Sequence, residues 1–249
     1  MSGYNEDVYN YLQCRKFEQD ETNSKIDYMV FVTHDLYESW IGKYGQPKAK
    51  CYCIPNSYDE TCYFFKDTTN TRDLGKIVLV TVGSVYKLKG QLRVVKAIAS
   101  SENKNKIKYI CIGNGKEENI NLLKKEASDL AVDLDFLGPK SPQEIREILL
   151  KSDFMILPSS YEGFGLVFLE SLACGVPVIL PKFLPIVKEK GIINESNSIL
   201  LHDESITSIK NVLNNLKPEI FIHANIASEI KVLSWDSVVK QYLKILQNE

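Results

Sequence analysis

The alternation of short β-branched runs with amphipathic segments, from Ile77 onward, constrains the fold of this chain most strongly. A β-branched run of about five residues is typical of a buried strand, and a longer amphipathic segment is typical of a covering helix. When the two alternate along a chain, they form βαβ crossovers and a parallel sheet. We therefore expect an α/β fold with a Rossmann-like parallel sheet and helices on both faces.

The expected elements follow this alternation. The expected strands cover residues 77–82, 107–112, 134–137, 154–157, 178–180 and 198–201. The expected helices between them cover residues 89–100, 117–131, 142–151 and 165–174. Ser141 precedes Pro142 and Glu144 in the pattern of a capping box, with proline at the first helical position. We place the Rossmann-like domain within residues 75–233.

The two ends of the chain have different patterns. Within residues 1–70 we expect a strand at 28–33, a helix at 35–44 and a strand at 50–54, which is too little to close a core alone. Residues 67–75 are polar and form the expected linker. At the other end Ser234 is a plausible N-cap of a final helix within residues 234–249. Its apolar side chains lie roughly on one stripe: Trp235, Val238, Val239, Tyr242 and Leu246.

Composition excludes several classes of function. With 44% hydrophobic and 25% charged residues, the chain has the composition of a globular protein. A net charge of −2 and a pI near 6.0 offer no basic surface for a nucleic acid. No apolar run is long enough to cross a bilayer, and Met1–Asp20 does not resemble a secretory signal. We expect a cytoplasmic protein without a transmembrane segment, with peripheral membrane association left open.

Six cysteines occur without a CxxC pair. Cys51 and Cys53 alternate along an expected strand and so point to one face. Reduced thiols are favoured over a metal pair here, because no second pair of Cys or His follows at the spacing of a zinc site.

Residues 153–178, DFMILPSSYEGFGLVFLESLACGVPV, carry the most chemical information. A buried strand ends at Pro158, a glycine-containing turn follows, and a helix begins near Gly165. Ligands bind at the carboxyl ends of parallel strands. Gly163 and Gly165 would let a ligand approach the backbone closely, so the amides of Phe164, Gly165 and Leu166 can bind an anion.

Two carboxylates flank this turn. Glu170 is placed to accept hydrogen bonds from the two hydroxyls of a ribose, and Glu162 lies nearer the expected reacting sugar. The alternative is a pair of solvated glutamates near a helix start, where the helix dipole alone favours acidic residues.

This segment resembles the signature of glycosyltransferase family 4, whose members are retaining enzymes of the GT-B fold. The shared pattern is E-x7-E within PS-x-x-EGFGL-x-x-LE-x-x-ACG-x-PV. The resemblance implies that Glu170 holds the nucleotide ribose and that Glu162, the candidate catalytic residue, lies near the donor sugar. It also implies that the amides of residues 164–166 contact the sugar or the phosphates.

The resemblance extends to the first predicted strand and its loop. Val80–Gly90, VTVGSVYKLKG, is similar to the family pattern V-G-R-L-x-x-x-K-G, whose Arg and Lys hold the donor diphosphate. Gly83 and Lys89 match that pattern, but Ser84 stands in place of the arginine. A hydroxyl donates one hydrogen bond and neutralises no charge, and Lys87 could substitute only without the guanidinium fork.

Other segments match the family more briefly. Phe136–Pro139 is similar to a segment beside the nucleotide base, which implicates Gly138 and Pro139. Ile54–Asn56 is similar to the turn before the interdomain linker, and Ser234, Trp235 and Tyr242 are similar to the helix that crosses back to the N-terminal domain. Residues 110–115 do not form a dinucleotide motif, because Glu118 occupies the third glycine position. After Val178 the match fades, and residues 182–186 replace the family's glycine-rich loop.

Family members have a full N-terminal domain, of which residues 1–70 resemble only a remnant. His34 lies in that remnant, and a surface role is favoured over a site role for it. Acceptor choice is normally determined by the missing half. The apolar faces left around residues 1–70 and the last helix predict a partner subunit or a homodimer.

The main hypothesis is a retaining glycosyltransferase, or the donor-binding subunit of a split one. The donor would be a nucleoside diphosphate sugar, UDP- or GDP-linked, with no metal required and no other cofactor. The acceptor would be a glycan, a lipid-linked molecule or a protein. The alternative is a non-catalytic nucleotide-sugar-binding or scaffold module that acts with a partner chain. A Rossmann oxidoreductase is a third reading, which lacks the phosphate fingerprint.

Overall fold

The structure is a computed structural model that describes residues 26–67 and 75–247. By packing, the chain divides into two compact units, residues 1–55 and 56–249. The expected linker, residues 67–75, lies almost entirely outside the described residues. The functional division into residues 1–70, 75–233 and 234–249 stays a prediction.

The first unit contains a two-stranded parallel sheet and one helix. Its elements are β1 (Tyr28–Phe31), α2 (His34–Tyr44) and β2 (Lys50–Cys53). Thr33 caps α2, because its hydroxyl accepts a hydrogen bond from the Leu36 amide at 3.2 Å. Phe31 and Trp40 pack edge to face with ring centroids 6.0 Å apart. The buried apolar residues among those described here are Pro47, Ala49 and Ile54, so this unit has a small core.

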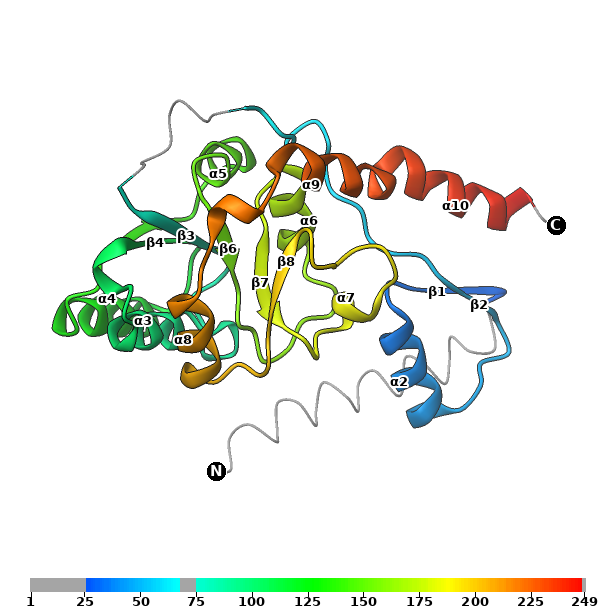
Figure 1. Cartoon of the computed structure of the whole chain (residues 1–249). Coiled ribbons are helices and arrows are strands. Elements are labelled where there is room, and N and C mark those ends of the chain that lie inside the picture. Colours follow the sequence, from blue (N-terminus) through cyan, green and yellow to red (C-terminus); the bar gives the residue numbers. More distant parts are fainter. Residues whose placement is uncertain (1–25, 68–74, 248–249) are drawn as a thin grey trace. The chain divides into compact units, whose positions relative to one another are not determined.

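The second unit is built on a six-stranded parallel sheet, seen nearly edge-on in Figure 1. Its strand order is β5-β4-β3-β6-β7-β8. The strands are β3 (Ile77–Val82), β4 (Ile107–Ile112), β5 (Leu134–Gly138), β6 (Phe154–Ile156), β7 (Val178–Pro181) and β8 (Ser198–Leu201). The order reverses between β3 and β6, as in a doubly wound Rossmann sheet. The predicted parallel sheet is confirmed.

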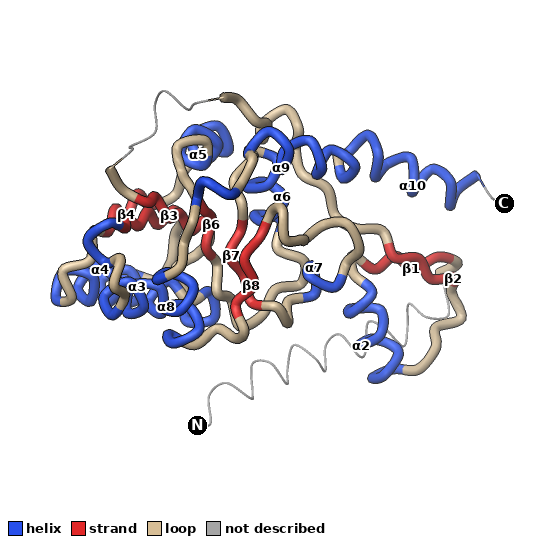
Figure 2. Tube along the Cα trace, viewed as in Figure 1, coloured by secondary structure: helices blue, strands red, loops and turns tan. Residues whose placement is uncertain are grey.

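Helices cover both faces of this sheet, as Figures 1 and 2 show. One face carries α3 (Gln91–Ser100), α4 (Glu117–Asp129) and α8 (Ile206–Asn214). The other carries α5 (Pro142–Leu149), α6 (Leu166–Ala173) and α9 (His223–Glu229). The remaining elements are η2 (Lys87–Lys89), η3 (Lys104–Lys106), α7 (Pro185–Lys188), η4 (Pro218–Ile220), η5 (Ile230–Leu233) and α10 (Trp235–Gln247).

The core lies between the central strands and the helices. Phe154, Met155 and Ile156 of β6 are fully buried, as are Leu79 and Val80 of β3. A strand buried on both faces has a continuous apolar sequence, which explains why the runs were readable. The capping box of α5 is confirmed, with the Ser141 hydroxyl accepting from the Glu144 amide and the Glu144 carboxylate accepting from the Ser141 amide.

The final helix carries the predicted apolar residues within α10. Of these, Val238 is buried, while Trp235, Val239, Tyr242 and Leu246 are exposed. Ile245 takes the second buried position of α10. A stripe read from spacing alone marks the apolar side of a helix and not the depth to which it packs.

Candidate nucleotide-sugar site

The predicted site residues gather at the carboxyl edge of the sheet, where its strand order reverses. The loop after β3 carries Gly83, Ser84 and Lys89, and the loop after β6 carries Glu162 to Gly165. Two hydrogen bonds to backbone carbonyls tie this region together. The Ser160 amide donates to the Leu88 carbonyl at 2.7 Å, and the Arg93 guanidinium donates to the Pro158 carbonyl at 2.6 Å. A crevice at such a reversal is where doubly wound sheets bind ligands.

Three glycine loops form a row along the same edge. The Gly83 amide donates to the Ile112 carbonyl, and the Gly113 amide donates to the Gly138 carbonyl, each at 2.9 Å. A Cβ on Gly113 would lie 2.1 Å from the Gly83 carbonyl oxygen. The loops after β3, β4 and β5 are thus linked through backbone groups, and side chains are absent at the glycines where they pass close together.

The start of α6 presents amides without protein acceptors. Gly165 precedes the helix with a left-handed φ of 85° and provides no side-chain cap. Among the described residues, no hydrogen bond links a protein acceptor to the amides of Phe164, Gly165 or Leu166. Gly163 has no atom within 4 Å of an added Cβ, which leaves its side open. Free amides at a helix start, together with the helix dipole, are suited to an anion.

Lys89 and Glu162 form an ion pair at this edge of the sheet. The Lys89 ammonium donates to the Glu162 carboxylate at 2.6 Å. The Glu162 side chain is 9% exposed and that of Lys89 is 30% exposed, so the pair is partly shielded from water. Sequence reasoning assigned these residues separately to sugar and diphosphate, and the structure brings them into direct contact. An arriving diphosphate would therefore compete with Glu162 for the Lys89 charge.

Glu170 lies on α6, one turn before Cys174. Burial raises the pKa of its carboxyl, and a hydrogen bond from the Tyr63 hydroxyl opposes that rise. Burial and the neighbouring Glu170 together raise the pKa of Tyr63 well above its usual range. Glu170 is thus half-buried, and it differs from the solvated glutamate of the alternative interpretation.

The remaining predicted site residues lie in or beside the loops after β3 and β5. Ser84 is exposed, and its carbonyl accepts from the Gln91 amide group at 2.9 Å. Pro139 is exposed and Gly138 is half-buried at the end of β5. Lys87, which could replace the absent arginine, is exposed in η2. Arg93 cannot take that role, because its guanidinium is bound to the Pro158 carbonyl, the Ser160 hydroxyl and the Lys87 carbonyl.

Three further side chains considered as site residues, Cys51, Cys53 and His34, belong to the first unit. Cys51 and Cys53 are half-buried on β2, and burial raises the pKa of the Cys51 thiol. No group of three or more His, Cys, Asp and Glu residues that could hold a metal occurs in the described part of the chain. His34 is exposed at the first position of α2. Within residues 26–67 and 75–247, no helix is both long and apolar enough to cross a bilayer.

Sequence reasoning missed Tyr63. The residue lies in an irregular segment that has no periodicity, so no pattern marked it. One signal was present, since Tyr63 closes a short turn that begins at Asp59, a residue type that favours turns. The Asp59 carbonyl accepts from the Tyr63 amide at 2.8 Å.

Comparison with known proteins defines the class. Residues 65–246, most of the chain, match the family described as Glycosyl transferases group 1. The chain therefore belongs to the group 1 glycosyl transferases, a transferase family.

Individual relatives are more distant. The chain is 30% identical over 158 residues to the N-acetyl-alpha-D-glucosaminyl L-malate synthase of Bacillus anthracis, which covers 61% of this chain and 41% of that protein. It is 26% identical over 179 residues to the D-inositol 3-phosphate glycosyltransferase of Rhodococcus erythropolis, with 67% of this chain and 40% of that protein covered. The matches thus span about two fifths of the length of these relatives.

Solved structures confirm the fold as that of GT-B glycosyltransferases. Sucrose-phosphate synthase from Thermosynechococcus elongatus is 16% identical with a TM-score of 0.79, covering 95% of this chain and 61% of its own. HepE from Anabaena, in complex with UDP and glucose, is 18% identical with a TM-score of 0.77, covering 94% and 66%. At these identities the likeness shows the fold alone.

Proposed function

We propose that this chain binds a nucleoside diphosphate sugar and acts in a retaining glycosyltransferase, either alone or as the donor-binding subunit of a split enzyme. One observation carries the proposal. The ion-paired Lys89 and Glu162 and the acceptor-free amides of the α6 start lie at the carboxyl edge, where the sheet order reverses. Family membership supports sugar transfer as the chemistry.

Each part of the donor has a proposed place. The Lys89 ammonium and the amides of Phe164, Gly165 and Leu166 would bind the diphosphate. The Glu170 carboxylate would accept hydrogen bonds from the ribose hydroxyls. The backbone around Gly138 and Pro139 would contact the base, and Gly83 and Ser84 would line the phosphate side. Glu162 would lie beside the sugar.

The chemistry follows from these charges. The bond between the anomeric carbon and the diphosphate oxygen would break, and its electron pair would leave with the diphosphate. An acceptor hydroxyl would form the new bond to the anomeric carbon, and its proton would pass to the released diphosphate. Lys89 and the α6 amides would stabilise that negative charge in place, without further reorganisation. Because these groups supply the positive charge, we assign no metal ion to this step. Positioning of donor and acceptor would supply the rest of the rate.

The proposed donor class, a nucleoside diphosphate sugar, rests on the site residues and is supported by similar solved structures. Structural neighbours include HepE in complex with UDP and glucose, and a pneumococcal O-GlcNAc transferase in complex with UDP and GlcNAc. A UDP-linked sugar is therefore the first donor to test and a GDP-linked sugar the second. The acceptor would be a glycan, a lipid-linked molecule or a protein.

A second candidate is a non-catalytic nucleotide-sugar-binding module that acts with a partner chain. Ser84 favours it, because the family arginine is absent and the half-buried Arg93 guanidinium, bound to Pro158 and Ser160, does not replace it. Such a module would bind the donor and leave it intact.

The test measures donor binding and turnover with purified protein, with and without candidate partner chains. We expect Glu170→Ala to weaken nucleotide binding and Glu162→Ala to reduce mainly turnover. Retention would appear as the same anomeric configuration in product and donor. Unchanged nucleotide binding by Glu170→Ala would contradict the assignment. Binding without transfer or donor hydrolysis, under every partner condition, would favour the non-catalytic module.

A further inference from the structure

A segment that we call the strap, residues 56–67, is held at its start by η5 and α10. The Ser57 hydroxyl donates to the Leu233 carbonyl at 2.6 Å. The Glu60 carboxylate accepts from the Trp235 amide at 2.9 Å through one of its two oxygens. The first half of the strap is therefore fixed beside the end of η5, and one oxygen of Glu60 is left over as an acceptor.

The end of the strap is held by α5 and by the turn after α6. The guanidinium carbon of Arg146 lies 4.2 Å from the centroid of the Phe64 ring. Phe65 packs where Gly175 has no side chain, because a Cβ there would lie 2.8 Å from the Phe65 ring. The Gly175 carbonyl also lies 2.7 Å from Nδ1 of His223, at the start of α9. The strap and α9 are thus both fixed against the end of α6.

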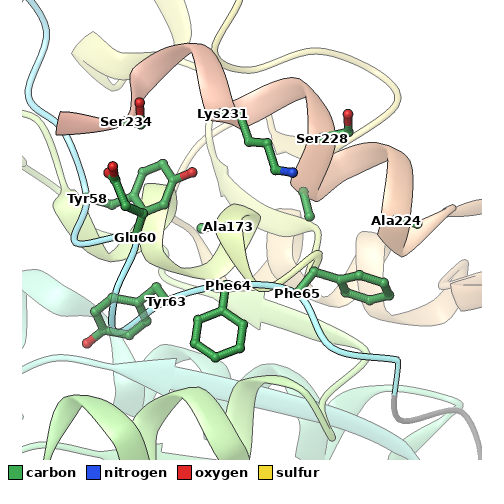
Figure 3. Close-up of a pocket in the computed structure, with 11 residues that line it drawn as sticks. Tyr58, Glu60, Tyr63, Phe64, Phe65, Ala173, Ala224, Ser228, Lys231 and Ser234 are labelled. Carbon is green, nitrogen blue, oxygen red and sulfur yellow. The ribbon is translucent and has the colours of Figure 1, made fainter. Parts of the chain in front are cut away.

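A cavity of about 420 Å³ lies between the strap and the helices α9 and η5, as Figure 3 shows. Small-molecule sites in proteins enclose about 300–1,000 Å³, so the cavity has room for a small ligand. Ala173, the last residue of α6, lines it, which places it about 10 Å along that helix from the amides at its start. None of the described residues that line the cavity belongs to the proposed donor site. The cavity is therefore a second site.

The strap supplies aromatic side chains to the cavity. Four of the eight residues from 58 to 65 are aromatic, and all four line it: Tyr58, Tyr63, Phe64 and Phe65. Phe64 is 42% exposed even though Arg146 holds its ring. In Figure 3 Ser228 and Lys231 lie on the side opposite Phe64 and Phe65. Small side chains leave the space between these walls open: Ala173, Ala224 and Ala227.

The polar groups of the cavity carry both signs of charge. The Lys231 ammonium is a cation and a donor, and the Glu60 carboxylate is an anion and an acceptor. The Ser228 hydroxyl can do either, and all three residues are exposed. A phosphate or a sulfate would meet the anion as well as the cation, so the pair does not favour a charged ligand. It favours a neutral ligand that both donates and accepts hydrogen bonds.

We propose that this cavity binds a neutral sugar unit of a glycan, apart from the donor site. A pyranose carries C–H groups on its faces and hydroxyls around its rim. It can therefore pack on aromatic rings while its hydroxyls bond to an ammonium, a carboxylate and a hydroxyl. The inference goes beyond the proposed function, because a glycan would bind here without a nucleotide. A glycan acceptor held at this second site would have a higher effective concentration near the donor site.

Saturation-transfer NMR on the purified full chain tests this site with four neutral trisaccharides. The probes are maltotriose, cellotriose, mannotriose and N,N′,N″-triacetylchitotriose. We expect at least one of them to bind in the absence of nucleotide. We also expect added UDP to leave it bound, because the cavity is separate from the donor site.

Two variants locate the bound sugar. Ala224→Phe adds a ring to the cavity from an exposed position of α9 and should abolish binding. Lys231→Met keeps the length of the side chain and removes the ammonium, and should weaken binding about tenfold. Lys244→Met is the matched control, because Lys244 is an exposed lysine of α10 that does not line the cavity. It should bind the trisaccharide as wild type does.

Several results would overturn the inference. They are no binding of any of the four trisaccharides, displacement by UDP, and an equal loss in Lys244→Met. Undiminished binding by Lys231→Met or by Ala224→Phe, at the melting temperature of wild type, would also do so. If trisaccharide binds and no nucleotide does, the proposed function fails and the inference holds. If nucleotide binds and no trisaccharide does, the inference alone fails.

Discussion

The fold disfavours the ionised form of the Glu170 carboxyl. Burial raises its pKa, so ionisation is less favourable in the folded state than in the unfolded state. A group with a raised folded pKa contributes stability below its ordinary pKa, and that contribution is lost as the pH rises through the folded value. A carboxyl whose ionisation the fold disfavours in this way is typical of a functional site.

Glu170→Gln should therefore raise the melting temperature at pH 7 relative to wild type. Glutamine has nearly the same size and shape as glutamate, so the substitution removes the charge and changes little else. The difference should shrink as the pH falls toward about 4, where Glu170 is protonated in both states. Thermal unfolding of both proteins across this range measures it. A stabilisation that does not change with pH would show that the charge is not its cause.

The site residues that could be predicted from the sequence were glycines and charged residues in a recognisable motif. Glu162, Lys89 and Gly165 stood in a readable motif, and the structure brings Lys89 and Glu162 into contact. Their pairing could not be predicted, because the two residues are 73 positions apart in the chain. Tyr63 escaped for the same reason, since its partner lies on a helix far along the sequence.

Among the elements, the row of glycine loops at the carboxyl edge shapes the site. Gly113→Ala would place a methyl group against the Gly83 carbonyl, in a backbone conformation with φ 143° that alanine rarely adopts. We expect a loss of at least about 1 kcal/mol in the free energy of unfolding. Chemical denaturation measures this loss.

Gly163→Ala is the contrasting substitution in the loop after β6. Its added methyl meets no atom within 4 Å, so the fold should tolerate it. If a nucleotide sugar approaches this backbone closely, the same methyl will weaken donor binding while the free energy of unfolding stays unchanged. Donor binding equal to that of wild type would show that Gly163 does not face the ligand.

Strands were more predictable than the later helices. The buried runs of β3 and β4 are apolar along their length, and their bounds were predicted to the residue. The helices α8 and α9 were not predicted, because they follow Val178, where the family resemblance fades, and because α9 has only seven residues. The exposed positions of α10 show that packing depth cannot be read from spacing.

The whole chain consists of two units with unequal cores. The first has three buried apolar residues among those described, whereas the second buries the side chains of a six-stranded sheet. A small core of this kind gives little independent stability. The two tryptophans fall one in each unit, Trp40 in the first and Trp235 in the second.

Unfolding should therefore not be a single event. We expect the fluorescence of Trp40, followed in a Trp235→Phe variant, to change at lower denaturant concentration than that of Trp235, followed in Trp40→Phe. Coincident transitions would mean that the units unfold together and that the first draws its stability from the second. The comparison also tests whether a partner chain, when added, stabilises the first unit selectively.

The central claim is that the α6 start, Lys89 and Glu170 form a site for a nucleoside diphosphate. Calorimetric titration of wild type and Glu170→Ala with UDP, GDP and ADP tests it most directly. We expect wild type to bind one of these nucleotides and Glu170→Ala to bind it at least about tenfold more weakly. Absence of binding to all three, or equal affinity in the two proteins, would contradict the claim.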